Sequence, residues 1–102
     1  MIDNYLLEEL TTFAEAGTLA ATAEQLQVTQ PTVTRGMQKL EDELGVELFV
    51  RQPNRIVLSK TGQFAASAAK KVLAQNQAFT DEVRKYELNQ RILQLGTVAP
   101  GP

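Results

Sequence analysis

The sequence predicts a mainly α fold, in which short helices meet at a tight turn, a two-stranded hairpin follows, and one long helix leads away. The stretch from Gly17 to Gly62 supports this prediction most strongly, because it reads as two short helices, a turn and an apolar hairpin. Helical spacing of apolar residues then continues beyond it. With 102 residues, 43% of them hydrophobic, the chain is long enough for one small domain with a modest core.

The first helix is expected to begin after Asp3, which can cap it, and to run to about Ala16. Gly17 follows and can adopt the left-handed conformation that ends helices. Apolar side chains recur at helical spacing along this segment, which predicts one buried side made of Leu6, Leu7, Leu10, Phe13 and Ala14.

Thr18 can cap a second helix over residues 19–26. Only Gln27 and Val28 separate this helix from Thr29, which can cap a third one. A connection so short forces a sharp angle between the two helices, as in helix-turn-helix units. The buried side of the second helix is expected to carry Leu19, Ala23 and Leu26.

The third helix is predicted over about residues 30–44, with Gly45 as its left-handed stop. Pro31 lies in its first turn, where a missing N–H is tolerated. Arg35 and Lys39 lie on one side of this helix. The other side is apolar and carries Val33, Met37, Leu40 and Leu44. A helix buried on one stripe, with hydrogen-bonding groups at its N-terminal tip, is what a reader of the DNA major groove needs.

Two short apolar runs, residues 48–50 and 56–58, flank a Pro53-Asn54 turn and predict a two-stranded wing, with Phe49 and Leu58 in the core. The fold class is therefore a winged helix-turn-helix. Ser59 can cap a fourth helix over roughly residues 60–90, about 45 Å long at 1.5 Å per residue.

The long helix carries a stripe of residues spaced by three and four: Ala69, Val72, Asn76, Phe79, Val83 and Tyr86. Residues 63–72 are expected to pack on the chain's own domain. Residues 76–86 are expected to meet a partner helix, because the compact part is too small to cover the whole helix. Asn76 can fix the register of that pair, and the dimer seam is predicted to contain Val72, Asn76, Phe79, Val83 and Tyr86.

Composition argues against an enzyme. The chain has no cysteine and no histidine, which excludes disulfides, thiolate metal sites and histidine-based nucleophile pairs. No pair of carboxylates lies in an apolar context suited to acid–base catalysis. No cofactor and no metal are expected. No run approaches the roughly 20 apolar residues of a membrane span, and the N-terminus is acidic, so a cytoplasmic protein is expected.

The formal net charge is −2, whereas nucleic-acid binders are usually basic. The charges are unevenly distributed, however. Residues 28–40 and residues 48–62 contain bases and no acids, so the bases lie in the predicted reading helix and wing. Residues 1–27 contain acids and no bases, and these acids should weaken non-specific binding: Asp3, Glu8, Glu9, Glu15 and Glu24.

Gln30, Thr32 and Arg35 are the base-reading candidates, since Gln pairs with adenine, Arg with guanine, and a Thr methyl contacts thymine. The alternative is that they are solvated residues on an exposed helix. Pro31 lies in the same turn and is also expected to contact DNA. Phosphate contacts are expected from helix N-termini and basic side chains: Thr18, Thr29, Thr34, Lys39, Arg51, Arg55 and Lys60. Thr18 and Thr29 can also serve as caps alone, Lys39 can be merely solvated, and Arg51 can equally brace the wing.

A series of residues with specific spacing runs through this region. It comprises Gly17-Thr18-Leu19, Ala21, Ala23 and Leu26, then Thr29-Gln30-Pro31-Thr32-Val33-Thr34-Arg35, Leu40-Glu41, Leu44-Gly45, Leu48-Phe49 and Arg51, and finally Leu58-Ser59-Lys60-Thr61-Gly62. In this pattern the segment closely resembles the N-terminal domain of LysR-type transcriptional regulators. With the first and the long helix, the likeness covers about residues 1–91.

The resemblance implies three parts: a DNA-binding domain at 1–62, a linker and dimerisation helix at 63–91, and a tail at 92–102. Ile92, Leu93 and Leu95 in this tail look like the first strand of the family's effector-binding domain, the rest of which is missing. The partners implied are double-stranded DNA and a second copy, joined through antiparallel linker helices. A tetramer and a small-molecule effector are implied only for a protein that has the effector domain.

Three positions depart from the family pattern or leave their role open. Thr22 replaces the usual alanine in a tight packing position. Gly36 lies inside the reading helix, where it either allows close approach to DNA or has no role. Glu41 is expected on a solvated face or paired with a basic side chain.

The alternative function is a winged-helix dimerisation scaffold without specific DNA binding. A third possibility for the function is a different winged-helix family that binds DNA as a compact dimer.

Overall fold

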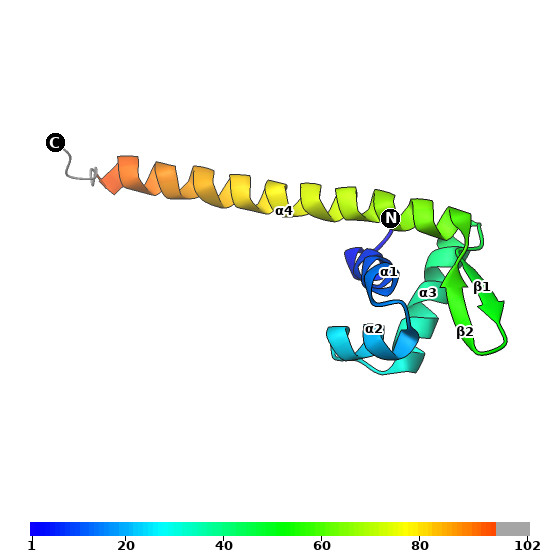
Figure 1. The fold of residues 1–102 in the computed structure, drawn as a ribbon. Coiled ribbons are helices and arrows are strands. Elements are labelled where there is room, and N and C mark those ends of the chain that lie inside the picture. The colour runs from blue at the N-terminus through cyan, green and yellow to red at the C-terminus, as the bar shows by residue number, and fades with distance from the viewer. Residues whose placement is uncertain (96–102) are drawn as a thin grey trace.

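The computed structural model describes residues 1–95 of the chain. Three helices form a compact unit, a two-stranded hairpin lies at its edge, and the fourth helix projects far beyond it (Figure 1). The elements are α1 Asn4–Ala16, α2 Leu19–Leu26, α3 Gln30–Leu44, β1 Phe49–Gln52, β2 Arg55–Leu58 and α4 Lys60–Leu95. This arrangement confirms the predicted winged helix-turn-helix with a long final helix.

The helix ends lie where the capping residues predict them. Asp3 Oδ1 accepts an N–H from the first turn of α1 at 2.9 Å, and Thr18 Oγ1 accepts one from the first turn of α2 at 3.0 Å. Gly17 and Gly45 end α1 and α3 with φ angles of 84° and 71°. α2 ends at Leu26 as predicted, but the left-handed residue that ends it was not predicted: Gln27 takes a φ of 59° without being glycine.

The core lies between α1, α3 and the start of α4. Its most enclosed apolar side chains, at 0–1% exposure, are Leu10, Val33, Leu40 and Leu48. Phe13 of α1 meets Phe49 of β1 edge to face, with ring centroids 5.3 Å apart. The hairpin is thereby attached to the helical core.

Several expected core residues lie elsewhere. Leu44 is 45% exposed, because it occupies the last turn of α3, beyond the stretch that carries Val33, Met37 and Leu40 into the core. Ala14 is also exposed. By contrast, Thr22 is fully enclosed, and its hydroxyl donates to the Thr18 carbonyl at 2.7 Å, so it replaces alanine without an unpaired polar group. Half-buried Leu7, Leu19, Phe49 and Leu58 line the core rather than fill it.

The wing is one antiparallel pair, with Phe49 opposite Leu58 and Gln52 opposite Arg55. Only the predicted Pro53-Asn54 pair remains as its turn. The strands therefore extend further toward this turn than the apolar runs 48–50 and 56–58 suggested, since backbone pairing includes polar residues. Arg55 Nε donates to Gln52 Oε1 at 3.2 Å at the last pair.

Glu41 differs from its expected role. Its Oε2 accepts hydrogen bonds from the backbone N–H groups of Leu48 at 2.7 Å and Phe49 at 3.3 Å. These N–H groups lie at the entry to β1, so the carboxylate holds the hairpin against α3. The expectation that Glu41 is solvated or paired with a basic side chain was wrong, because contacts across the Gly45 turn cannot be read from helical spacing.

α4 begins under tight constraints. Ser59 Oγ accepts the Gly62 N–H at 2.9 Å and donates to the Glu47 carbonyl at 3.2 Å. A side chain at Gly62 would overlap the Leu48 carbonyl, so glycine is required where α4 passes the hairpin. Both contacts fix the direction in which α4 leaves the domain.

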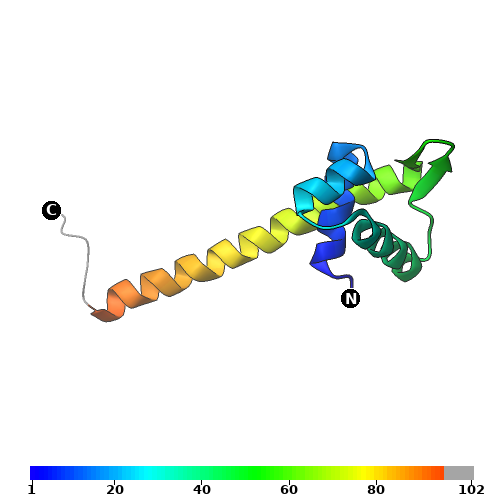
Figure 2. The ribbon, with the colours of Figure 1, turned by 90° about the horizontal axis from the view of Figure 1, so that it is seen from below.

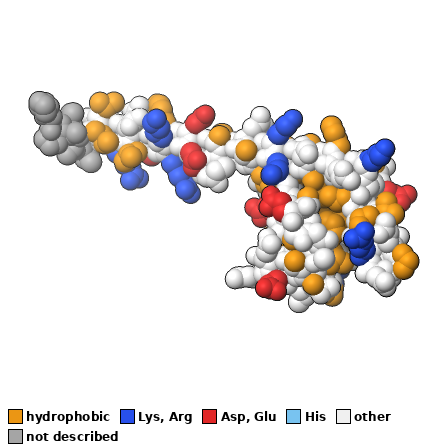
Figure 3. Space-filling model, viewed as in Figure 1, with side chains coloured by type: hydrophobic (Ala, Val, Ile, Leu, Met, Phe, Trp, Pro, Cys, Tyr) orange, Lys and Arg blue, Asp and Glu red, His pale blue; other side chains and the backbone are white. Residues whose placement is uncertain are grey.

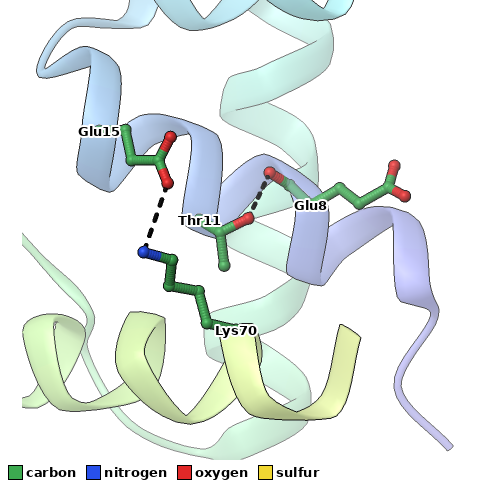
Figure 4. A network of polar contacts seen from close by, with 4 residues as sticks. All are labelled: Glu8, Thr11, Glu15 and Lys70. Carbon is green, nitrogen blue, oxygen red and sulfur yellow. Dashed lines mark hydrogen bonds and ion pairs between the residues drawn. The ribbon is translucent and has the colours of Figure 1, made fainter. Parts of the chain in front are cut away.

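The first part of α4 packs on α1, as predicted for residues 63–72. Ala66 and Ala69 are buried against the core, and α1, which lies next to α4 in Figure 1, crosses it in the turned view (Figure 2). Lys70 Nζ lies 3.6 Å from Glu15 Oε1 across this contact, and Thr11 donates to the Glu8 carbonyl nearby (Figure 4). The ion pair is solvent-exposed and contributes little to stability.

The rest of α4 extends away from the domain. The helix has 36 residues, about 54 Å, and continues through residues 92–95, where a strand start was expected. That expectation was wrong because the helical pattern of the preceding turns simply continues. The remainder of the tail, residues 96–102, lies outside the described residues. Among residues 1–95 no helix is long and apolar enough to cross a membrane.

Candidate nucleic-acid interface

The outward side of α3 is an exposed polar surface of the helix-turn-helix. Val33, Met37 and Leu40 face the core. On the opposite side, Pro31, Arg35, Gln38 and Asp42 recur at intervals of four, three and four residues and are all exposed. We call these four residues the outer stripe of α3. Arg35 is not buried by any other part of residues 1–95.

The N-terminal tip of α3 is held by a threonine pair. Thr29 Oγ1 lies 2.9 Å from Thr32 Oγ1 and accepts the Thr32 N–H at 3.4 Å. Thr32 is therefore half-buried and engaged with its cap, beside rather than on the outer stripe. Gln30 and Pro31 at the same tip are exposed.

Two shallow hollows lie on this surface, and at one of them residues predicted from separate segments meet. Gln30, Pro31, Thr34 and Arg35 line one of them, over the first half of α3. Thr18, Gln30 and Arg55 line the other together with Asn54, although they belong to the start of α2, the start of α3 and the wing. The fold thus places the tips of both motif helices and the wing turn on one continuous surface.

A third hollow, of about 530 Å³, separates α3 from the wing. The residues that line it include Thr34, Gln38, Arg51, Glu41 and Glu47. Arg51 therefore lies beside the outer stripe of α3. Lys39 and Lys60 line none of these hollows. The predicted contact residues are exposed except for half-buried Thr32 and Thr34: Thr18, Thr29, Gln30, Pro31, Arg35, Lys39, Arg51, Arg55 and Lys60.

Beneath α3 lies a feature that the sequence did not reveal. Glu9 of α1 is 1% exposed, and its Oε1 has no hydrogen-bond partner in the structure. Burial raises the pKa of Glu9 from 4.5 to about 7. A side chain at Gly36 would overlap the Glu9 carboxyl group.

Gly36 thus faces α1 and not the outer stripe, so neither of the two alternatives, close approach to DNA or no role, describes it. The glycine makes room for a buried acid directly under the middle of α3. The signal for this was the acid among the apolar spacings of α1, at position 9 between Leu6 and Leu10. From the sequence, Glu9 counts only among the acids of residues 1–27 that are expected to weaken non-specific binding.

The projecting part of α4 carries the stripe predicted as a dimer seam. Val72, Phe79, Val83 and Tyr86 are 42%, 67%, 52% and 65% exposed. Hydrophobic side chains recur along this helix in the space-filling view (Figure 3). Asn76 Nδ2 donates to Asn4 Oδ1 at 2.7 Å, so within the single chain this amide marks the end of the contact between α1 and α4.

No cluster of three or more acidic side chains placed to hold a metal ion occurs within residues 1–95. The site therefore consists of a helix surface, two helix tips and a wing. Its arginines are Arg35, Arg51 and Arg55, and the acids of α3 lie toward the C-terminal end, at Glu41, Asp42 and Glu43. Such an arrangement places positive charge beside hydrogen-bonding groups at the N-terminal half of α3.

Known proteins are similar to this chain in sequence. The HTH-type transcriptional regulator TcbR of Pseudomonas sp. (strain P51) is 45% identical over 60 residues, which are 59% of this chain and 20% of that protein. The HTH-type transcriptional regulator CrgA of Neisseria meningitidis serogroup C (strain 8013) is 31% identical over 97 residues, 91% of this chain and 32% of that protein. The chain thus spans a third or less of the length of these relatives.

Solved structures agree in fold. The crystal structure of the CbnR_DBD–DNA complex superimposes with a TM-score of 0.79 at 35% identity, covering 83% of this chain and 98% of that one. The crystal structure of CbnR, a LysR family transcriptional regulator, gives a TM-score of 0.76 at 36% identity, covering 80% of this chain and 28% of that one.

The sequence model described as "Bacterial regulatory helix-turn-helix protein, lysR family" matches residues 6–63, from α1 to the start of α4. This range contains the helix-turn-helix, the wing and every residue of the outer stripe. The chain belongs to the lysR family of bacterial regulatory helix-turn-helix proteins.

Proposed function

We propose that this chain is a sequence-specific DNA-binding module of a transcriptional regulator. α3 enters the major groove by its N-terminal half, and the wing lies on the DNA backbone. The observation that carries the proposal is the outer stripe of α3, where Arg35 is exposed one turn from the helix tip. The relatives are transcriptional regulators, and the CbnR_DBD fold is found in a DNA complex.

Each part of the surface has a role in this proposal. Arg35 presents five donors and suits the O6 and N7 of guanine, whereas Gln30 suits adenine. Thr32 supplies a methyl group at the edge of the tip. The remaining residues contact phosphates and set the orientation of the module: Thr18, Thr29, Thr34, Lys39, Arg51, Arg55 and Lys60.

A second copy completes the module. The exposed seam Val72, Asn76, Phe79, Val83 and Tyr86 is proposed to pair with the same seam of another chain, in antiparallel orientation. This pairing removes from water a stripe that the single chain leaves open. Residues 1–62 would then read DNA, and residues 63–91 would join the two copies. A tetramer and a small-molecule effector belong to this proposal only for a longer protein, acting in the cytoplasm.

Binding to two kinds of duplex tests the proposal. A high-affinity duplex is first selected from a random-sequence pool, and binding to it is compared with binding to a scrambled duplex at fixed low salt. Arg35→Ala should lose about 1–3 kcal/mol on the selected duplex and relax the preference at one base pair. Lys60→Ala, the matched phosphate contact, should weaken both duplexes alike and reduce the salt dependence by about one unit of slope.

The net charge of −2 favours one competing function, a dimeric winged-helix scaffold that does not read DNA. The same assay separates the two. If the pool yields no preferred sequence, and neither substitution changes binding, the scaffold replaces the proposed function. If Arg35→Ala loses the same factor on both duplexes, Arg35 contacts the backbone and its reading role is refuted.

A further inference from the structure

The outer stripe of α3 contains a side chain that the sequence did not single out. Gln38 is exposed and lies between Arg35 and Asp42 on the side opposite the core. Its Nε2 donates to Asp42 Oδ1 at 3.2 Å. Gln38 also lines the hollow between α3 and the wing, together with Thr34. The contact between Gln38 and Asp42 therefore lies on the face that the proposed function turns toward DNA.

The chemistry of this pair restricts the orientation of the amide. A carboxylate only accepts hydrogen bonds, so Gln38 must turn its NH₂ group toward Asp42. The carbonyl oxygen then points away from the acid and stays available. One N–H of the Gln38 amide donates to Asp42, and the other N–H remains available as a donor. The combination of one acceptor and one donor on the same amide edge fits the N6 and N7 groups of adenine.

We infer that Gln38 is a second base-reading residue, that it selects adenine, and that Asp42 is the positioning residue that fixes the orientation of its amide. This inference rests on the proposed function. Gln38 lies three residues beyond Arg35, about 4.5 Å along the helix axis at 1.5 Å per residue. Base pairs are spaced by about 3.4 Å, so the adenine is one or two base pairs from the pair that Arg35 reads.

Position along the helix explains why an acid is tolerated on this surface. Asp42 lies about 10 Å along the axis from Arg35, toward the end of α3 that leaves the groove. Its charge is thus kept away from the phosphates nearest the helix tip. The simpler alternative is an ordinary stabilising pair at i and i+4 on an exposed helix.

Selection from a random-sequence pool distinguishes the two. The wild type, Gln38→Ala, Asp42→Ala and the control Glu43→Ala are each used to select duplexes at one salt concentration, and affinities are then measured for duplexes that differ at single positions. Glu43 is an exposed acid on the same turn but outside the outer stripe, so its removal changes the charge equally. Circular dichroism confirms that each variant is folded.

The wild type should prefer adenine at one position near the Arg35 position. Gln38→Ala should reduce that preference about five- to tenfold. Asp42→Ala should weaken the adenine preference too, because the Gln38 amide, without its partner, can rotate so that its oxygen and nitrogen exchange places and it can then pair with guanine or thymine. Glu43→Ala should preserve the adenine preference. The Arg35 position should stay unchanged in all variants.

Three outcomes overturn the inference. The first is an unchanged adenine preference in Asp42→Ala. The second is an equal increase in affinity for all duplexes in Asp42→Ala and Glu43→Ala, which would mean that Asp42 acts by charge alone. The third is a Gln38→Ala effect that is the same on every duplex. In these cases the wild type still selects a sequence and the proposed function stands; only a wild type without any preferred sequence refutes both.

Discussion

The buried Glu9 makes the stability of this domain depend on pH in a predictable direction. In the folded chain its pKa is about 7, against 4.5 for the free side chain, because burial disfavours the charged form. The folded state therefore binds the proton more tightly than the unfolded state. The stability that this provides is fully present below pH 4.5 and is lost as the pH rises to about 7.

The size of the effect follows from the shift. Each pKa unit corresponds to about 1.4 kcal/mol, so the rise from 4.5 to about 7 corresponds to about 3 kcal/mol of unfolding free energy between acidic and mildly alkaline pH. Glu9→Gln keeps the shape of the side chain and removes the charge. We expect the variant to be more stable than the wild type at pH 8 by up to that amount, and nearly equal to it at pH 4.5.

Urea denaturation followed by circular dichroism at several pH values between 4.5 and 8 measures this difference. The control is Glu8→Gln, the neighbouring acid, which is exposed in the structure. It should shift the unfolding free energy by no more than a few tenths of a kcal/mol and without the same pH dependence. If Glu9→Gln and Glu8→Gln gave parallel curves, Glu9 would be solvated and our account of the space under α3 would be wrong.

Three further predictions concern packing and assembly. Gly36→Ala should destabilise the fold in urea denaturation although alanine favours helices by about 1 kcal/mol, and Glu9→Ala should restore stability in the double variant; additive effects would contradict their contact. Glu41→Ala should cost about 1–3 kcal/mol by leaving two N–H groups unpaired, and no loss in urea denaturation would contradict this. Phe79→Asp combined with Val83→Asp should give monomers in analytical ultracentrifugation, because the dimer would bury unpaired charges. An unchanged dimer would contradict the proposed seam.

The sequence predicted the local features of the fold well, because they depend on neighbouring residues. Caps such as Thr18 act within one turn, and glycines such as Gly45 act at a single φ angle. The apolar stripe of α3 likewise follows from helical period. Thus element order, the helix-turn-helix and the exposed position of Arg35 were all available from the sequence.

The features that escaped prediction depend on contacts between elements. Glu9 and Gly36 are far apart in the chain and meet only when α1 packs on α3. Glu41 reaches β1 across the turn at Gly45. Helical spacing alone gives neither of these pairings. It does give the pair of Gln38 and Asp42, at i and i+4 of α3, but not the hollow that Gln38 shares with the wing.

The central claim, that α3 reads DNA in a dimer joined by α4, is tested most directly by a hydroxyl-radical footprint on a duplex selected from a random-sequence pool. The account predicts two protected segments on one face of the duplex, with centres separated by at least one helical turn, about 34 Å. The Phe79→Asp, Val83→Asp variant should lose this paired protection at the same concentration. A wild-type footprint confined to one isolated half-site, or one that is identical in the variant, would contradict it.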